Sequence, residues 1–299
     1  MAEKPEAKPK PPKAAAKSGG GVKPDIATLA GIALAAAGIL GGLLLEKGSI
    51  SDIAQTTAAM IVLGGTFGAV LVTTPLPVFM RAMKGMLDVF LEKSGDTAAT
   101  IETLVGFATQ ARKNGIVSLE TEAAKITEPY MKKALNLAVD GTDLNELRKM
   151  MEIDIDLSEQ AADAEAKVWE AAGGYSPTIG IIGAVMGLIQ VMKHLDDIKE
   201  VGHGIAVAFV ATVYGVAAAN ILFLPAAGKL KAKIQKNKVV KEMVLEGVIG
   251  IVEGLNPTLI RMKLTAFNPE PEAPKKATNA KGAKAGAKAG APQAAPAGS

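Results

Sequence analysis

Four long stretches without a charged side chain constrain the fold of this chain more than any other feature of its sequence. The first covers residues 26–45, and a helix of that length rises about 30 Å, which matches the hydrocarbon core of a bilayer. Three more uncharged stretches follow at residues 53–74, 175–192 and 204–228. The alternative is four buried helices of a soluble protein, because Ala-rich runs are only moderately apolar. The pattern favours four transmembrane helices.

The distribution of Lys and Arg predicts how these spans are oriented. Basic residues gather before the first span, between the second and third, and after the fourth, whereas the two remaining connections are short and hold few. Cytoplasmic loops of membrane proteins carry an excess of Lys and Arg. Both termini and the long middle segment are therefore predicted to be cytoplasmic.

The middle segment has the pattern of amphipathic helices. Ile101, Leu104, Val105 and Ala108 recur at i, i+3, i+4 and i+7, and no strand-rich run is present. Turn signals divide the segment into three predicted helices, at residues 97–113, 119–139 and 143–171. The predicted fold class is an all-α membrane protein with four transmembrane helices and a helical cytoplasmic domain inserted between spans two and three.

Composition completes the predicted domain organisation. The two ends are rich in Lys, Pro, Ala and Gly and cannot bury enough apolar surface to order themselves, although loose attraction to anionic lipid is an alternative role for them. The predicted segments are a disordered extension (1–24), spans one and two (25–79), the cytoplasmic domain (80–174), spans three and four (175–230), a cytoplasmic C-terminal helix (231–268) and a disordered tail (269–299).

Several function classes lack the residues that they require. The chain has no Cys and only two His, which argues against a metal site. No nucleophile elbow, phosphate-binding Gly loop or catalytic carboxylate pair is recognisable, so neither an enzyme nor a cofactor is expected. No nucleic-acid partner is expected either. A proton relay needs an intramembrane carboxylate or His, and the four spans contain none. Either the chain conducts nothing, or a partner helix supplies the acid.

The spans themselves carry a specific resemblance to a known family. The stretches concerned are DIATLAGIALAAAGILGG, IVLGGTFGAVLVTTPL, SPTIGIIGAVMGLIQVM and GIAVAFVATVYGVAAANILFLPAAGKLK. In order and spacing they resemble the four membrane segments of the MotA/PomA family, and the resemblance covers residues 25–267. It implies the A subunit of a flagellar stator in the bacterial inner membrane. In that family a homopentamer surrounds two single-span B subunits, each of which brings an essential Asp.

The resemblance also implies a mechanism. Ions passing between the A and B subunits would turn the A ring, whose cytoplasmic domain pushes on the FliG-type switch protein of the rotor. The work would come from the ion gradient, at about 2.3 kcal/mol per elementary charge and 100 mV.

Four membrane residues match positions that the family uses. Thr212 matches the threonine that faces the acid of the B subunit, although a hydroxyl bonded to its own backbone explains it equally well. Ala184 stands where sodium-driven members usually carry Thr, so protons are the expected ion. Pro177 and Pro225 match two prolines at the cytoplasmic ends of spans three and four. Pro225 would bend span four, whereas Pro177 is also explained as a residue of a first helical turn.

Two charged residues match the pair that touches the rotor in this family. These are Arg112 and Glu120, which otherwise read as ordinary solvated surface charges. Nearby charges that could share the contact are Lys113, Glu122, Lys125 and Glu128. Asp25 is interpreted as the N-cap of the first span.

Other interpretations remain open at this point. They are an ExbB/TolQ-like energiser, a stator of a non-flagellar surface machine, a sodium-driven stator and a non-conducting membrane scaffold. The ExbB/TolQ type has three spans, so four spans count against it.

Overall fold

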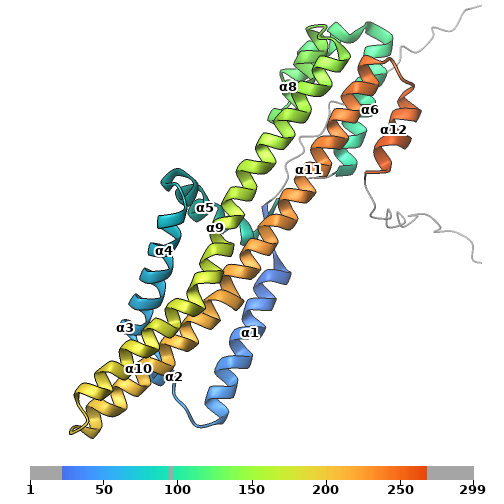
Figure 1. Ribbon diagram of the computed structural model, residues 1–299. Helices are drawn as coiled ribbons and strands as arrows, with labels where there is room; N and C mark the ends of the chain where they lie inside the picture. Colours follow the sequence, from blue (N-terminus) through green and yellow to red (C-terminus); the bar gives the residue numbers. More distant parts are fainter. Residues whose placement is uncertain (1–21, 94–96, 268–299) are drawn as a thin grey trace, which may run out of the picture. The chain divides into compact units, whose positions relative to one another are not determined.

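The computed structural model describes residues 22–93 and 97–267, which form helices and one small sheet (Figure 1). Most of both segments predicted to be disordered therefore lies outside the described residues. The last residues of the predicted N-terminal extension are described, and they form strand β1 (Val22–Pro24), which pairs antiparallel with β2 (Leu91–Lys93). This sheet was not predicted, because three-residue strands leave no periodic pattern.

The first two spans lie where the uncharged stretches predict them. Helix α1 (Ile26–Leu45) begins after Asp25, whose carboxylate accepts a hydrogen bond from the backbone N–H of Thr28, so the predicted N-cap is present. The short α2 (Ile50–Ile53) follows. Span two consists of three helical segments in succession, α3 (Thr56–Ala59), the π-helix η1 (Met60–Gly64) and α4 (Gly65–Thr73). Helix α5 (Leu76–Phe90) leads out of it.

The inserted domain has more helix boundaries than the sequence predicts. It contains α6 (Thr97–Asn114), the 3₁₀ helix η2 (Ile116–Leu119), α7 (Glu120–Ala123) and α8 (Pro129–Val139). The prediction of one helix at 119–139 was wrong. The helix restarts at Pro129, whose missing N–H costs nothing in a first turn, and the Glu128 carboxylate caps the backbone N–H groups that follow.

Helix α9 (Leu144–Lys193) is a single helix of 50 residues that joins the inserted domain to span three. The predicted end at residue 171 and the placement of Pro177 in a first turn were therefore both wrong. Pro177 lies inside the helix and has no N–H to donate to the Gly173 carbonyl. Span four is α10 (Ile198–Ala217), the π-helix η3 (Ala218–Phe223) and the start of α11 (Leu224–Val252).

The predicted C-terminal helix at 231–268 is divided in two. Helix α11 ends at Val252, Gly254 adopts a positive φ of 70°, and α12 (Pro257–Thr265) begins after the Asn256 cap. Only glycine adopts this left-handed conformation readily, so Gly254 is the residue that permits the helix to end here.

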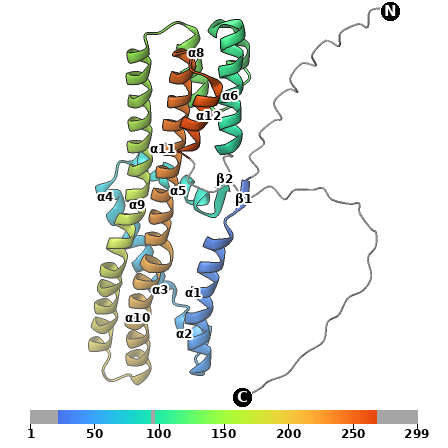
Figure 2. The ribbon, with the colours of Figure 1, turned by 90° about the vertical axis from the view of Figure 1, so that its right-hand side faces the viewer.

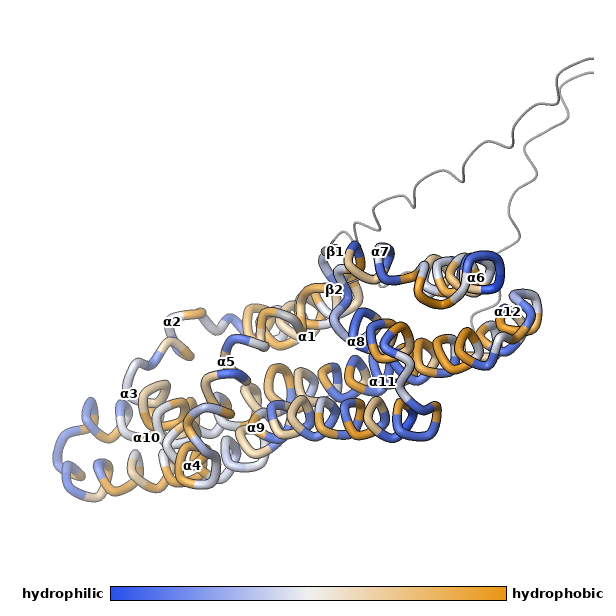
Figure 3. Tube along the Cα trace, turned by 90° about the horizontal axis from the view of Figure 1, so that it is seen from above, coloured by the Kyte–Doolittle hydropathy of each residue, from blue (hydrophilic) through white to orange (hydrophobic). Residues whose placement is uncertain are grey.

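Two long helices connect the membrane part to the inserted domain. Helices α9 and α11 pack along each other, and Figures 1 and 2 both draw them side by side. The inserted domain buries its core between α6, α8 and α12 and the distal halves of α9 and α11. Among the described residues, four helical segments are long and apolar enough to span a membrane, and Figure 3 shows the hydrophobic residues along α1, α4 and α10. The described residues thus confirm the predicted fold class.

Candidate functional site

Helices α9 and α10 meet along a seam of small residues. A Cβ atom added to Gly187 of α9 would lie 2.7 Å from the carbonyl oxygen of Gly204 on α10. A Cβ atom on Gly180 would lie 2.9 Å from the carbonyl oxygen of Ala211, and one on Gly183 would lie 2.7 Å from the Ala211 Cβ. The two backbones are therefore in contact, which is how helices associate in lipid.

Polar contacts hold α10 against both α9 and the start of span two. The buried hydroxyl of Ser176 on α9 donates to the carbonyl oxygen of Gly215 on α10 at 3.0 Å. The residue before Gly215 is Tyr214, whose hydroxyl donates to the carbonyl of Ile53 and accepts from the backbone N–H of Gln55 at 3.3 Å. Tyr214 thereby ties span four to the start of span two. Neither contact was predicted, since only the fold brings these residues together.

The two predicted ion-pathway residues lie in the same stretch of the seam. Gly183 faces Ala211, and Ala184 and Thr212 are the next residues on the two helices. Both are half-buried. The Thr212 hydroxyl donates to the carbonyl oxygen of Ala208, one turn earlier, at 3.2 Å. The hydroxyl of Thr212 is therefore bonded to the backbone of its own helix, as the alternative interpretation predicts. Because the hydroxyl is the donor in this bond, its oxygen lone pairs remain free to accept.

The outer sides of both seam helices are apolar and open. The fractional exposures of Phe209 and Val213 on α10 are 70% and 45%, and those of Ile181 and Val185 on α9 are 57% and 51%. Side chains of this kind on a transmembrane helix contact either lipid or further apolar helices. The seam alone therefore does not enclose a path, and a path would need another helix against this face.

The two prolines predicted to couple ion passage to movement, Pro177 and Pro225, lie at different positions in their helices. Pro225 is the second residue of α11 and follows directly on the π-helix η3, a rare irregularity that is frequent at functional sites. Phe223, the last residue of η3, is buried with its ring centroid 5.9 Å from Trp169 and 5.8 Å from Phe67. Pro177 lies within α9, one residue after the buried Ser176. The π-helices η1 and η3 were not predicted, because the pattern of apolar residues does not distinguish a π-helix from an α-helix.

An ion pair that joins the two ends of the chain's membrane part was missed by sequence reasoning. Asp25, only 5% exposed, pairs with Lys229 of α11, one turn after Pro225. The Lys229 ammonium, followed by the backbone N–H of Thr28, lowers the pKa of Asp25 to about 2. Strand β1 continues this contact, because the backbone N–H of Asp25 donates to the Phe90 carbonyl beside the small sheet.

The predicted rotor contact flanks the connection from α6 to α7, with Arg112 in the last turn of α6 and Glu120 at the first position of α7. Arg112 and Glu120 are both exposed, and neither forms an ion pair within the described ranges. Gly115 turns the chain with a φ of 82°, and the Gln110 side-chain amide donates to the Ser118 carbonyl at 3.0 Å. Leu119, between the two charges, is fully buried. The packing therefore presents two unpaired charges on the two sides of a well-packed connection.

The neighbouring charges are engaged in local contacts. Lys125 pairs with Glu122 at 2.8 Å, and Glu128 caps α8. Lys113 is exposed in the last turn of α6. Across the described residues, no group of three or more His, Asp or Glu side chains is placed to hold a metal ion.

Two family models match most of the chain. The "Motility protein A N-terminal" model matches residues 29–115, and the "MotA/TolQ/ExbB proton channel family" model matches residues 122–243. The second model describes a family of proton channels rather than enzymes. The prediction that the chain is not an enzyme is therefore confirmed.

Named relatives and solved structures agree with these models. The chain is 36% identical to Motility protein A of Helicobacter pylori over 85% of its own length and 98% of the relative's. It is 32% identical to Chemotaxis protein PomA of Vibrio alginolyticus over 79% and 92% of the two lengths. A structure described as C. jejuni MotAB superposes with a TM-score of 0.78 at 32% identity, covering 85% of this chain and 100% of the other.

A structure of the flagellar MotAB stator complex from Bacillus subtilis gives a TM-score of 0.75 at 33% identity, with 81% and 95% of the two chains covered. These matches extend over both the membrane spans and the inserted domain. The chain therefore belongs to the MotA/TolQ/ExbB family, as a flagellar stator A subunit of the MotA/PomA type.

Proposed function

We propose that this chain conducts protons across the bacterial inner membrane together with a single-span B subunit and converts the proton-motive force into torque on the flagellar rotor. The observation that carries the proposal is the α9–α10 seam. It presents Ala184 and Thr212 beside an open apolar face, and the uncharged stretches 175–192 and 204–228 that contain them hold no Asp, Glu, Lys, Arg or His. Two of the solved relatives are described as complexes of MotA with MotB.

The missing acid explains why a partner is required. A proton crossing the hydrocarbon core needs a carboxylate or imidazole to bind it at intermediate depth. An Asp on a helix of the B subunit, packed against the exposed face of α9 and α10, would bring that group beside Thr212. A homopentamer would surround the B helices with copies of this face, and would bury the apolar side chains exposed in one chain.

Ala184 favours protons over sodium as the transported ion. A partly dehydrated sodium ion needs oxygen ligands, whereas a proton that hops onto a carboxylate does not. A methyl group at position 184 offers no oxygen ligand to such an ion, whereas a Thr at this position would.

The segment from Arg112 to Glu120, which joins α6 to α7, is the proposed contact with a FliG-type rotor protein. Arg112 and Glu120 are exposed charges of opposite sign, and complementary charges orient transient partners and speed their encounter. This assignment places the inserted domain and both termini in the cytoplasm, as the distribution of Lys and Arg predicts. Movement at η3 and Pro225, between the seam and α11, would couple ion passage to the loop.

Rotation of tethered cells tests the proposal. The chain and its B partner are expressed in a stator-deleted host, and the proton and sodium gradients are collapsed separately. Rotation that stops only with the proton gradient is the expected result. Rotation that follows the sodium gradient would overturn the ion assignment, and an absence of rotation despite membrane insertion would favour a non-flagellar machine.

Two variants separate a motor from a membrane scaffold. Thr212→Val and Pro225→Leu should each reduce torque while the protein still inserts, since the first removes the hydroxyl beside the acid and the second removes the backbone restraint after η3. Thr73→Val is the matched control, because the hydroxyl of Thr73 also donates to its own helix but lies in span two. Normal torque in both seam variants would favour the scaffold.

A further inference from the structure

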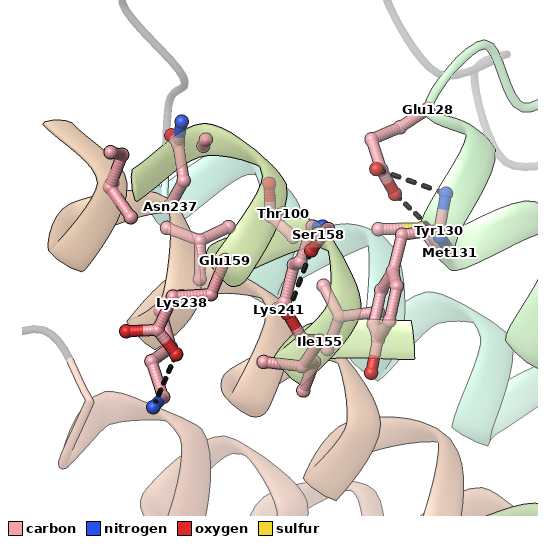
Figure 4. A pocket seen from close by; sticks show the side chains of 14 residues that line it. Thr100, Glu128, Tyr130, Met131, Ile155, Ser158, Glu159, Asn237, Lys238 and Lys241 are labelled. Atoms are coloured by element: carbon pink, nitrogen blue, oxygen red, sulfur yellow. Dashed lines mark hydrogen bonds and ion pairs between the residues drawn. The ribbon is translucent and has the colours of Figure 1, made fainter. Parts of the chain in front are cut away.

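The inserted domain contains a pocket that the motor mechanism does not use. Its volume is about 380 Å³, within the range of small-molecule sites, and it lies between α9 and α11 beside the first turns of α6 and α8 (Figure 4). Aliphatic side chains form much of its wall: Met131, Ile155, Ile234, Val240 and Val244.

Both carboxylates at this pocket are already held by donors of the protein. Glu128 accepts from the backbone N–H groups of Tyr130 at 3.1 Å and of Met131 at 2.5 Å. Glu159 accepts from the ammonium of Lys238 at 2.7 Å and from the amide of Gln235 at 3.0 Å. Each carboxylate is therefore already oriented by donors of the protein rather than by Lys241.

Lys241 is different, because its half-buried ammonium faces the pocket without a carboxylate. The ammonium donates to the Ser158 hydroxyl at 2.5 Å and lies 5.4 Å from the centroid of the Tyr130 ring. Ser158 in turn donates to the carbonyl of Ile155 at 2.8 Å, so its oxygen is oriented toward Lys241. Within residues 22–93 and 97–267 no Asp or Glu pairs with Lys241.

An ammonium has three N–H donors, and Ser158 uses one of them. A cation that is partly removed from water without a counter-ion is unfavourable unless other groups compensate it. Asn237 lies one turn earlier on α11 and also lines the pocket. The Lys241 ammonium and the aliphatic side chains of the wall are together complementary to an oxyanion that carries an apolar body.

We propose that this pocket binds a small organic anion. Its phosphate or carboxylate group is held by the Lys241 ammonium, its apolar part lies against the aliphatic wall, and Ser158 is a positioning residue for Lys241. The site is separate from the α9–α10 seam and from the Arg112–Glu120 loop. Occupancy would change how α8, α9 and α11 are held together, within the domain proposed to contact the rotor.

Calorimetric titration of the purified full chain with three aromatic probes tests the site. Phenyl phosphate and benzoate carry the two candidate headgroups on a similar apolar body, and benzyl alcohol is the uncharged match. At least one anion should bind with a Kd of about 1 mM or tighter. Benzyl alcohol should bind much more weakly, and the tighter anion identifies the preferred headgroup.

Matched variants assign the binding to Lys241. Lys241→Met keeps the aliphatic stem and should weaken anion binding at least about tenfold, because it removes charge-assisted hydrogen bonds. Lys236→Met changes the net charge equally on the same helix, but Lys236 is exposed and outside the pocket, so binding should persist. If Lys241→Met does not fold, two other measurements take its place. One is the affinity of Lys241→Gln, and the other is the affinity of the wild-type protein, which should fall as the salt concentration rises.

The proposal is overturned if neither anion binds, if benzyl alcohol binds equally well, or if Lys241→Met keeps wild-type affinity. Assembled copies of the chain that fill the pocket with a neighbour's side chain would give the first of these results. The readout is heat of binding, so the outcome is independent of whether the chain turns a rotor.

Discussion

The hydroxyl of Ser176 on α9 donates a 3.0 Å hydrogen bond to the backbone carbonyl of Gly215 on α10, and a Cβ atom on Gly215 would lie 2.6 Å from the Ser176 carbonyl. A side chain at this point would therefore push the two spans apart. The bond forms only because the residue opposite Ser176 is a glycine. The seam depends in this way on small residues throughout its length.

Substitution along the seam should reveal this dependence. Gly187→Ala places a methyl group against the backbone of Gly204 and should destabilise the protein by about 1–3 kcal/mol. Gly174→Ala is the control in the same helix, since nothing lies within 4 Å of its added Cβ, and it should be neutral or stabilise by up to about 1 kcal/mol. Thermal unfolding in one detergent measures both, and equal effects would contradict close backbone packing.

The ion pair between Asp25 and Lys229 should make stability depend on acid. The pKa of Asp25 is lowered from 3.8 to about 2 in the folded protein, so protonation favours the unfolded state. Its contribution is complete above about pH 4 and is lost as the pH falls toward 2. Asp25→Asn should lower the melting temperature at pH 7 and flatten its decline in this acid range.

A control and a double variant complete this test. Asp140→Asn removes an exposed carboxylate and should leave the melting temperature at pH 7 unchanged. Lys229→Met combined with Asp25→Asn should cost less than the sum of the two single changes, because both remove the same pair. Strict additivity would show that the two residues do not interact in solution.

The spans were predictable because the bilayer imposes a simple rule on length and charge. All four appear where uncharged stretches of sufficient length occur, and the N-cap at Asp25 follows from its position before the first. The seam was partly predictable from its glycines. By contrast, Gly173 and Pro177 resemble helix breakers locally, yet α9 continues through both. Gly173 is needed for close packing, because an added Cβ would lie 2.5 Å from the Leu224 side chain.

Contacts between distant segments account for the features that the sequence did not reveal. The pairing of Asp25 with Lys229, the bond from Tyr214 to Ile53, and the pocket at Lys241 all depend on how helices far apart in the chain are packed. The π-helices have no periodic signature. Local patterns predict helices, whereas these contacts are properties of the assembled fold.

Charge reversal at the loop after α6 should affect the motor without affecting the fold. Arg112→Glu and Glu120→Arg each change an exposed side chain, so unfolding free energy should shift by no more than about 0.5 kcal/mol. Torque at high load should fall in both variants if the loop touches the rotor. Lys132→Glu, an exposed reversal on α8, is the control and should leave torque intact. Equal losses in all three would indicate a general charge effect.

Truncating Phe223 should loosen the π-helix that precedes Pro225. Phe223 is 1% exposed between Phe67 and Trp169, and Phe223→Ala should cost about 3–5 kcal/mol because it leaves a cavity. Trp169 is the single tryptophan of the chain and its ring centroid lies 5.9 Å from that of Phe223, so its fluorescence reports the change directly. The emission should move to longer wavelength as water reaches the ring.

Phe209→Ala, on the open face of α10, should leave the emission unchanged. An unchanged emission in Phe223→Ala would mean that the cluster does not hold η3, and that Pro225 alone determines the geometry there.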